Sequence, residues 1–113
     1  MKRILKDIRY FQTNVYHTTF KENVLICYTT HPFRHQPSIS HTSLAEARII
    51  AELFSQMNYN VDIIDHNSTW QPNYKKYEVV FGFGDPFEES FYQGKKDQIR
   101  IFYATGAHPC FKI

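Results

Sequence analysis

Histidines are concentrated in polar loops that follow apolar runs of this sequence. His31 and His41 follow the first such run, and His108 follows the last one. Imidazole changes its charge near neutral pH and is a common ligand-binding and metal-binding group. We therefore predict a pocket for a polar ligand, although histidines are also common in loops that bind nothing. The candidate ligand-binding residues are His31, Arg34, His41, Thr42, Gly82, Gly84, Thr105, Gly106 and His108.

A metal site is an alternative interpretation of the same loops. His108 and Cys110 could supply two ligands, with His31 or His41 as a third, but their spacing matches no zinc signature. Cys110 as a nucleophile paired with His108 is a weaker alternative, because a separation of two residues does not ensure that the side chains meet. The site residues that we predict therefore include no metal ligand.

Nucleotide-binding motifs are missing from the positions where they would be needed. The loop over residues 29–42 contains no glycine, which argues against a P-loop and a dinucleotide-binding fingerprint. Gly82 and Gly84 lack a third glycine, since Phe87 stands at that position. We interpret both glycines as parts of a tight turn, and we expect no cofactor.

Strands and helices alternate along the part of the chain that carries these loops. Residues 24–28 and 61–64 are short apolar runs typical of buried strands, and residues 43–57 between them have apolar side chains at helical spacing. Ser43 and Glu46 fit a capping box at the helix start, and Asn58 fits a left-handed helix end. We expect further strands at 77–83 and 99–104, with a short helix from Pro86 to about residue 92.

A strand, helix, strand order without hairpin turns predicts parallel pairing. The expected fold class is therefore α/β, with a parallel doubly wound (Rossmann-like) sheet of about four strands and helices packed on it. Ligands bind such sheets at the carboxyl ends of the strands. If the four strands follow the order third, second, first, fourth, the loops after the first and fourth strands flank one crevice, and five of the six histidines lie on that edge.

The two ends of the chain fit this scheme less well. Residues 1–22 predict an N-terminal arm or short helix, and residues 23–113 form the α/β domain. No helix follows the fourth strand, so the domain is incomplete relative to a full one. That strand would be an exposed edge, or be covered by residues 1–22, by a second domain or by self-association.

Composition restricts the classes of partner. With 113 residues the chain suits one domain, and a net charge of +2 gives no electrostatic case for nucleic acid. No stretch is apolar enough for a transmembrane segment, and charged residues interrupt any signal peptide after Leu5. Free Cys27 and Cys110 would suit a reducing compartment, so we expect a cytoplasmic protein.

Several segments together resemble a known family. These are Asn23 to Phe33, the helix that follows His41, the run from Tyr59 to Asp65, the strand that ends at Gly82, and Tyr-Ala-Thr-Gly-Ala-His at 103–108. They are similar to the N-terminal Rossmann-like half of bacterial GT-B glycosyltransferases from surface-polysaccharide gene clusters. The resemblance covers roughly residues 23–111.

The resemblance implies an acceptor-binding role. In such enzymes the N-terminal half binds the acceptor, and a second domain, which has no counterpart in this sequence, holds the nucleotide-sugar. His41 and His108 would then hold a hydroxyl or phosphate of a saccharide acceptor, and the chain would not catalyse transfer alone. The alternatives are a stand-alone interaction or oligomerisation domain and a small metal-binding protein.

Overall fold

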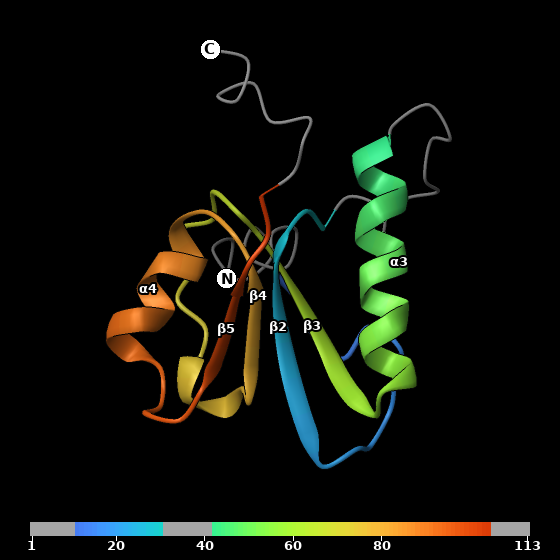
Figure 1. Ribbon diagram of the computed structural model, residues 1–113, viewed down its shortest axis with the longest axis horizontal. Helices are drawn as coiled ribbons and strands as arrows, with labels where there is room; N and C mark the ends of the chain where they lie inside the picture. The colour runs from blue at the N-terminus through green and yellow to red at the C-terminus, as the bar shows by residue number, and fades with distance from the viewer. Residues whose placement is uncertain (1–10, 31–41, 105–113) are drawn as a thin grey trace, which may run out of the picture.

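The computed structural model describes residues 11–30 and 42–104, with the side chains of residues 42–44 outside the description. It confirms the α/β class, with a mixed sheet between two α-helices (Figure 1). The elements in chain order are β1 (Phe11–Gln12), β2 (Glu22–Tyr28), α3 (Thr42–Gln56), β3 (Tyr59–Asp65), the 3-10 helix η1 (Tyr74–Lys76), β4 (Val79–Gly82), α4 (Asp85–Gln93) and β5 (Ile99–Phe102).

The five strands form one sheet in the order β1-β3-β2-β4-β5. β2 pairs in parallel with β3 on one side and with β4 on the other, and β5 pairs in parallel with β4. The strand order expected from the sequence is wrong, because β4 and not β5 lies beside β2. Val79 and Val80 of β4 are buried on opposite faces, which suits a central strand, whereas β5 carries Arg100 and half-exposed Ile99, which suits an edge.

The N-terminal segment completes the opposite edge of the sheet. Phe11 and Gln12 pair antiparallel with Ile64 and Ile63 of β3, so the sheet is mixed where an all-parallel sheet was expected. Residues 11–22 thus lie along β3 and not β5, and the expected covering of the last strand by residues 1–10 stays a prediction. Residues 1–10, where a short helix was expected, lie outside the described residues.

Each face of the sheet has its own hydrophobic core. On the face covered by α3, Ala47, Ala51 and Phe54 pack against a group that includes Val24 and Ile26 of β2. On the opposite face, η1, Tyr77 and α4 cover a second group of strand side chains, which are Leu25, Cys27, Ile64 and Val80. Figure 1 shows α3 and α4 on opposite sides of the sheet. None of the helices in the described ranges is long and apolar enough to cross a bilayer.

The local signals at the helix ends agree closely with the structure. α3 begins at Thr42, one residue before the expected start, and Asn58 after it adopts a left-handed conformation with φ of 70°. Pro86 lies in the first turn of α4, where its missing N–H costs no helical hydrogen bond.

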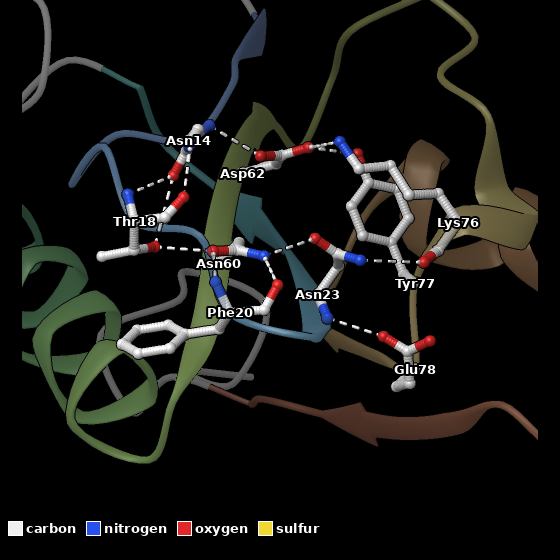
Figure 2. Close-up of polar contacts among 9 residues, drawn as sticks. All are labelled: Asn14, Thr18, Phe20, Asn23, Asn60, Asp62, Lys76, Tyr77 and Glu78. Atoms are coloured by element: carbon white, nitrogen blue, oxygen red, sulfur yellow. Dashed lines mark hydrogen bonds and ion pairs between the residues drawn. The ribbon is translucent and has the colours of Figure 1, made fainter.

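A buried carboxylate fixes the segments that flank β3 (Figure 2). Asp62 is 1% exposed, and it accepts hydrogen bonds from the Asn14 N–H at 2.7 Å and the Tyr77 hydroxyl at 2.6 Å. Lys76 Nζ lies 3.1 Å from the same carboxylate. Burial, followed by the charge of Asp62, raises the pKa of Tyr77, so this hydroxyl remains a donor.

Asparagines form a second polar group at the amino end of the sheet. The Asn60 side chain accepts hydrogen bonds from the Thr18 hydroxyl at 2.7 Å and the Phe20 N–H at 2.9 Å. It donates to the Phe20 carbonyl at 2.8 Å and to Asn23 Oδ1 at 3.1 Å (Figure 2). This group ties the connection between β1 and β2 to the start of β3.

Replacing Asp62 by Ala should strongly destabilise the fold. The change leaves the buried Tyr77 hydroxyl and the Asn14 N–H without their acceptor, and we expect the free energy of unfolding to fall by about 3 kcal/mol. Urea unfolding followed by circular dichroism measures the loss. Asp97→Ala, at an exposed position, is the control and should change stability by less than about 0.5 kcal/mol. Equal effects of the two changes would contradict this role.

Glu78 should make stability depend on pH in the acidic range. Burial alone would raise its pKa, but hydrogen bonds from Lys95 and the Asn23 N–H outweigh burial and lower the pKa from its ordinary value of 4.5. The unfolded chain then binds this proton at higher pH than the folded chain. Its stabilising contribution is therefore present above pH 4.5 and is lost as the pH falls through the lower, folded pKa.

Thermal unfolding between pH 3 and 7 tests this expectation, since Glu78→Gln should lose stability at pH 7 and show a smaller decrease on acidification. Glu88→Gln, at an exposed helix position, serves as the comparison. A Glu78→Gln curve parallel to that of the unchanged protein would argue against the assignment.

Candidate functional site

The strand connections diverge between β2 and β4. From β2 the chain crosses through α3 to β3 on one side, and from β4 it crosses through α4 to β5 on the other side. The carboxyl ends of β2 and β4 therefore lie where the two connections separate, which is the usual place for a ligand in an open α/β sheet.

A glutamate and two tyrosines meet at this carboxyl edge. Glu46, in the second turn of α3, accepts hydrogen bonds at Oε1 from the Tyr28 hydroxyl at 3.1 Å and the Tyr103 hydroxyl at 3.2 Å. Tyr28 ends β2 and Tyr103 follows β5, so three separate elements contribute to one contact. The other carboxylate oxygen of Glu46 has no hydrogen-bond partner among the residues that the structure describes.

Aromatic rings surround the Glu46 contact. The Tyr28 ring lies edge-on to Phe83 at 5.5 Å between centroids and to Tyr103 at 5.8 Å. The exposed His66 ring stacks on Phe83 at 4.9 Å with an interplanar angle of 30°. We call Tyr28, Glu46, His66, Phe83 and Tyr103 the edge cluster.

The tyrosines of the edge cluster stay neutral at physiological pH. Burial first, and then the hydrogen bond to Glu46, raises the pKa of Tyr28. The same two causes, in the same order, raise the pKa of Tyr103. Neutral hydroxyls donate to one oxygen of the carboxylate, and the other oxygen has no hydrogen-bond partner within residues 11–30 and 42–104. This combination suits a ligand that offers hydroxyl donors and a C–H face, and it provides no activated nucleophile.

The two glycines predicted at this edge have structural reasons to be glycine. Gly82 and Gly84 have positive φ values of 131° and 93°. A Cβ at Gly82 would collide with the Cys27 carbonyl, and a Cβ at Gly84 would collide with the His66 carbonyl. The Asp85 N–H donates to that His66 carbonyl at 2.8 Å. Gly82 therefore allows β4 to approach β2 closely, and Gly84 allows the residues after β4 to approach the loop after β3.

Most of the predicted ligand-binding residues lie outside the described residues, so their grouping stays a prediction. Those residues are His31, Arg34, His41, Thr105, Gly106 and His108. Thr42 is the first residue of α3, and its side chain is not described. The observed strand order separates the ends of β2 and β5 by the width of β4, which puts the two strands about 10 Å apart instead of side by side.

Sequence patterns missed the polar centre of the edge cluster. Glu46 was interpreted as a capping residue because it stands three positions after Ser43, yet its carboxylate binds two tyrosines. Tyr28 and Tyr103 are each the last aromatic residue of an apolar run that ends at the carboxyl edge. A tyrosine in that position on two strands is the signal that could have pointed to this site.

A buried aspartate joins the carboxyl ends of β2 and β3. Asp65, 8% exposed at the end of β3, accepts a hydrogen bond from the Thr30 N–H at 2.7 Å. The His66 N–H in turn donates to the Tyr28 carbonyl at 3.0 Å. These two hydrogen bonds join the end of β2 and the residues after it to the end of β3 and His66, which fixes the backbone that carries Tyr28 and His66 of the edge cluster.

A cavity of about 340 Å³ lies at another place in the molecule, between residues 12–17 and Arg48 of α3. It contains none of the residues predicted from the sequence. Tyr16 contributes to its wall, and burial raises the pKa of this tyrosine.

A metal site receives no support from the described part of the chain. Within residues 11–30 and 42–104, no three His, Cys, Asp or Glu side chains are grouped so as to hold a metal ion. The predicted ligands His108 and Cys110 fall outside these ranges.

No protein-family model, curated protein sequence or solved structure matches this chain.

Replacing Glu46 by Ala should lower the pKa of both tyrosines of the edge cluster. Burial raises the pKa of each tyrosine most, and the hydrogen bond to the carboxylate raises it further, so the loss of Glu46 removes part of the increase. NMR titration of tyrosine Cζ resonances at alkaline pH measures the change. Glu52→Ala, at an exposed position of the same helix, should leave Tyr28 and Tyr103 unchanged. Unchanged titration in the Glu46 variant would exclude the contact in solution.

Proposed function

We propose that this domain binds a saccharide at the edge cluster, as the acceptor-binding half of a glycosyltransferase would. The observation that carries the proposal is the Glu46 carboxylate, which uses one oxygen for two tyrosine hydroxyls, while its other oxygen has no partner among the described residues. Sugar hydroxyls donate well to a carboxylate, and hydrogen bonds to charged groups are among the stronger ones in proteins. The exposed ring of His66, which stacks on Phe83, provides an aromatic surface for the C–H face of a sugar ring.

The relation to GT-B glycosyltransferases remains part of this proposal. It rests on the resemblance of residues 23–111 to their N-terminal half, and it draws support from an α/β sheet whose four longer strands pair in parallel. A Rossmann-like, doubly wound arrangement accounts for helices on both faces and for a ligand site where the connections diverge. Placement in the bacterial cytoplasm, in polysaccharide biosynthesis, follows from the same relation and agrees with the free thiol of buried Cys27.

Catalysis is not assigned to the edge cluster. Its tyrosines are held neutral, and their hydroxyls donate to one oxygen of the Glu46 carboxylate, so the cluster supplies no activated nucleophile. Transfer of a sugar also needs a bound donor, and the proposed role of this domain is to present the acceptor hydroxyl. We expect nucleotide-sugar donors to bind no better than the free sugars that they contain.

Titration of the ¹⁵N-labelled protein with neutral disaccharides tests the proposal by NMR. Maltose, cellobiose and lactose at millimolar concentrations should shift the backbone amides of Thr30, His66 and Phe83 around the edge cluster. Glu46→Gln keeps the shape of the side chain but removes its charge, and it should weaken binding by about ten-fold. UDP-glucose and inorganic phosphate, used as separate probes, distinguish sugar binding from recognition of an anion.

The matched control is Glu52→Gln, which makes the same chemical change on α3 at an exposed position outside the cluster. It should bind sugars as the unchanged protein does. Shifts that are produced by phosphate alone, or sugar shifts that survive Glu46→Gln, would overturn the proposal.

A further inference from the structure

Glu46 differs from two other carboxylates of this protein in having no cationic partner among the described residues. Lys76 Nζ lies 3.1 Å from the carboxylate of Asp62 (Figure 2). Lys95 Nζ lies 2.8 Å from the carboxylate of Glu78. Glu46 is half-buried, and its partners in the described ranges are two neutral tyrosine hydroxyls. A carboxylate that is partly removed from water is stabilised by a positive charge beside it, so a cationic ligand would supply what the two lysines supply elsewhere.

The hydrogen-bonding groups around Glu46 are acceptors towards a ligand. Tyr28 and Tyr103 each donate their hydroxyl proton to Glu46, so their oxygens can accept a hydrogen bond but cannot donate a second one. The second carboxylate oxygen of Glu46 also can only accept. An ammonium group carries three donors and no acceptor, whereas a sugar hydroxyl brings its own lone pairs toward these oxygens. The contact is therefore better matched to an ammonium group than to a hydroxyl.

The charges near this contact, within the part of the chain that the structure describes, also favour a cation. Asp65 ends β3 and is 8% exposed, and exposed Asp85 begins α4. No lysine or arginine occurs among the described residues that follow the strands, which are residues 29–30, 66–70, 83–84 and 103–104. Arg48 comes two positions after Glu46, about 200° around α3, and it lines the separate cavity described above. Arg34 falls outside the described residues.

We propose that the edge cluster prefers a saccharide with a free, protonated amino group, whose ammonium binds Glu46. This inference rests on the proposed saccharide-binding function and narrows its ligand to the amino sugars. The ammonium would donate to the second oxygen of Glu46 and to the hydroxyl oxygens of Tyr28 and Tyr103. N-Acetylation turns the ammonium into a neutral amide with one donor and one acceptor, so it removes the charge and most of the donors. The proposal therefore predicts discrimination between a free and an acetylated amino sugar.

NMR titration of the ¹⁵N-labelled full chain with glucosamine, N-acetylglucosamine and glucose tests this preference. The comparison is made at about pH 6.5, where the amine is protonated, and at constant ionic strength. Glucosamine should bind about ten-fold more tightly than the other two sugars, because a hydrogen bond between two charged groups is stronger than one to a neutral donor. Equal affinities for the three sugars would overturn the preference and leave saccharide binding itself intact.

The ratio of the two affinities identifies the residue that recognises the ammonium. In Glu46→Gln the preference for glucosamine over N-acetylglucosamine should fall to about one. The matched control is Asp97→Asn, which removes one negative charge at an exposed position just before β5, at the opposite end of the parallel strands, and should keep the preference. A general loss of structure would weaken both sugars alike and would not change the ratio. A preference that survives Glu46→Gln would overturn the assignment.

Methylammonium chloride, a cation without a sugar, separates failure of this inference from failure of the proposed function. It should displace glucosamine only at concentrations that are higher by about ten-fold or more, since it lacks the contacts of the sugar ring. If it binds as tightly as glucosamine, the site recognises a cation alone, and both proposals fail. If neutral sugars bind as tightly as glucosamine and methylammonium does not bind, only the preference for an amino group fails.

Discussion

The buried carboxylate of Asp62 is the interaction on which the arrangement of the chain around β3 depends. Its donors come from the segment after β1, from η1 and from the residue that follows η1, so one side chain holds three parts of the chain together. A charge removed from water is costly unless several donors surround it. That cost makes alternative positions of these segments unfavourable, because each of them would leave the carboxylate or the Tyr77 hydroxyl unpaired.

The amino and carboxyl ends of the parallel strands differ in how completely their polar side chains are hydrogen-bonded within the protein. At the amino end, Asn60 uses both its amide oxygen and its amide nitrogen within the protein, and a bound ligand would find few available groups there. At the carboxyl end, Glu46 keeps an oxygen without a partner among the described residues, and the edge cluster also contains exposed His66. At the amino end the hydrogen bonds within the protein hold the segments in place. At the carboxyl end the carboxylate oxygen without a partner among the described residues is a group that a ligand can use.

Local patterns in the sequence predicted β2, α3, β3 and α4 well, because apolar spacing and end residues such as Asn58 and Pro86 act over a few residues. Local patterns did not predict the strand order, because this order depends on which strand is buried on both faces. β1, with two residues, is too short to produce a pattern. The edge cluster was missed because Glu46 and Tyr103 are 57 positions apart in the sequence. The predicted histidine pocket lies largely outside the described residues and remains a prediction.

The position of Cys27 has a consequence for thiol chemistry on this protein. The thiol is fully buried in the second hydrophobic core, and burial raises its pKa, so it stays protonated and out of contact with solvent. Alkylating reagents need the thiolate and access to it. They will therefore modify Cys27 only when the centre of the sheet opens, and the rate of that modification measures how often the native sheet comes apart.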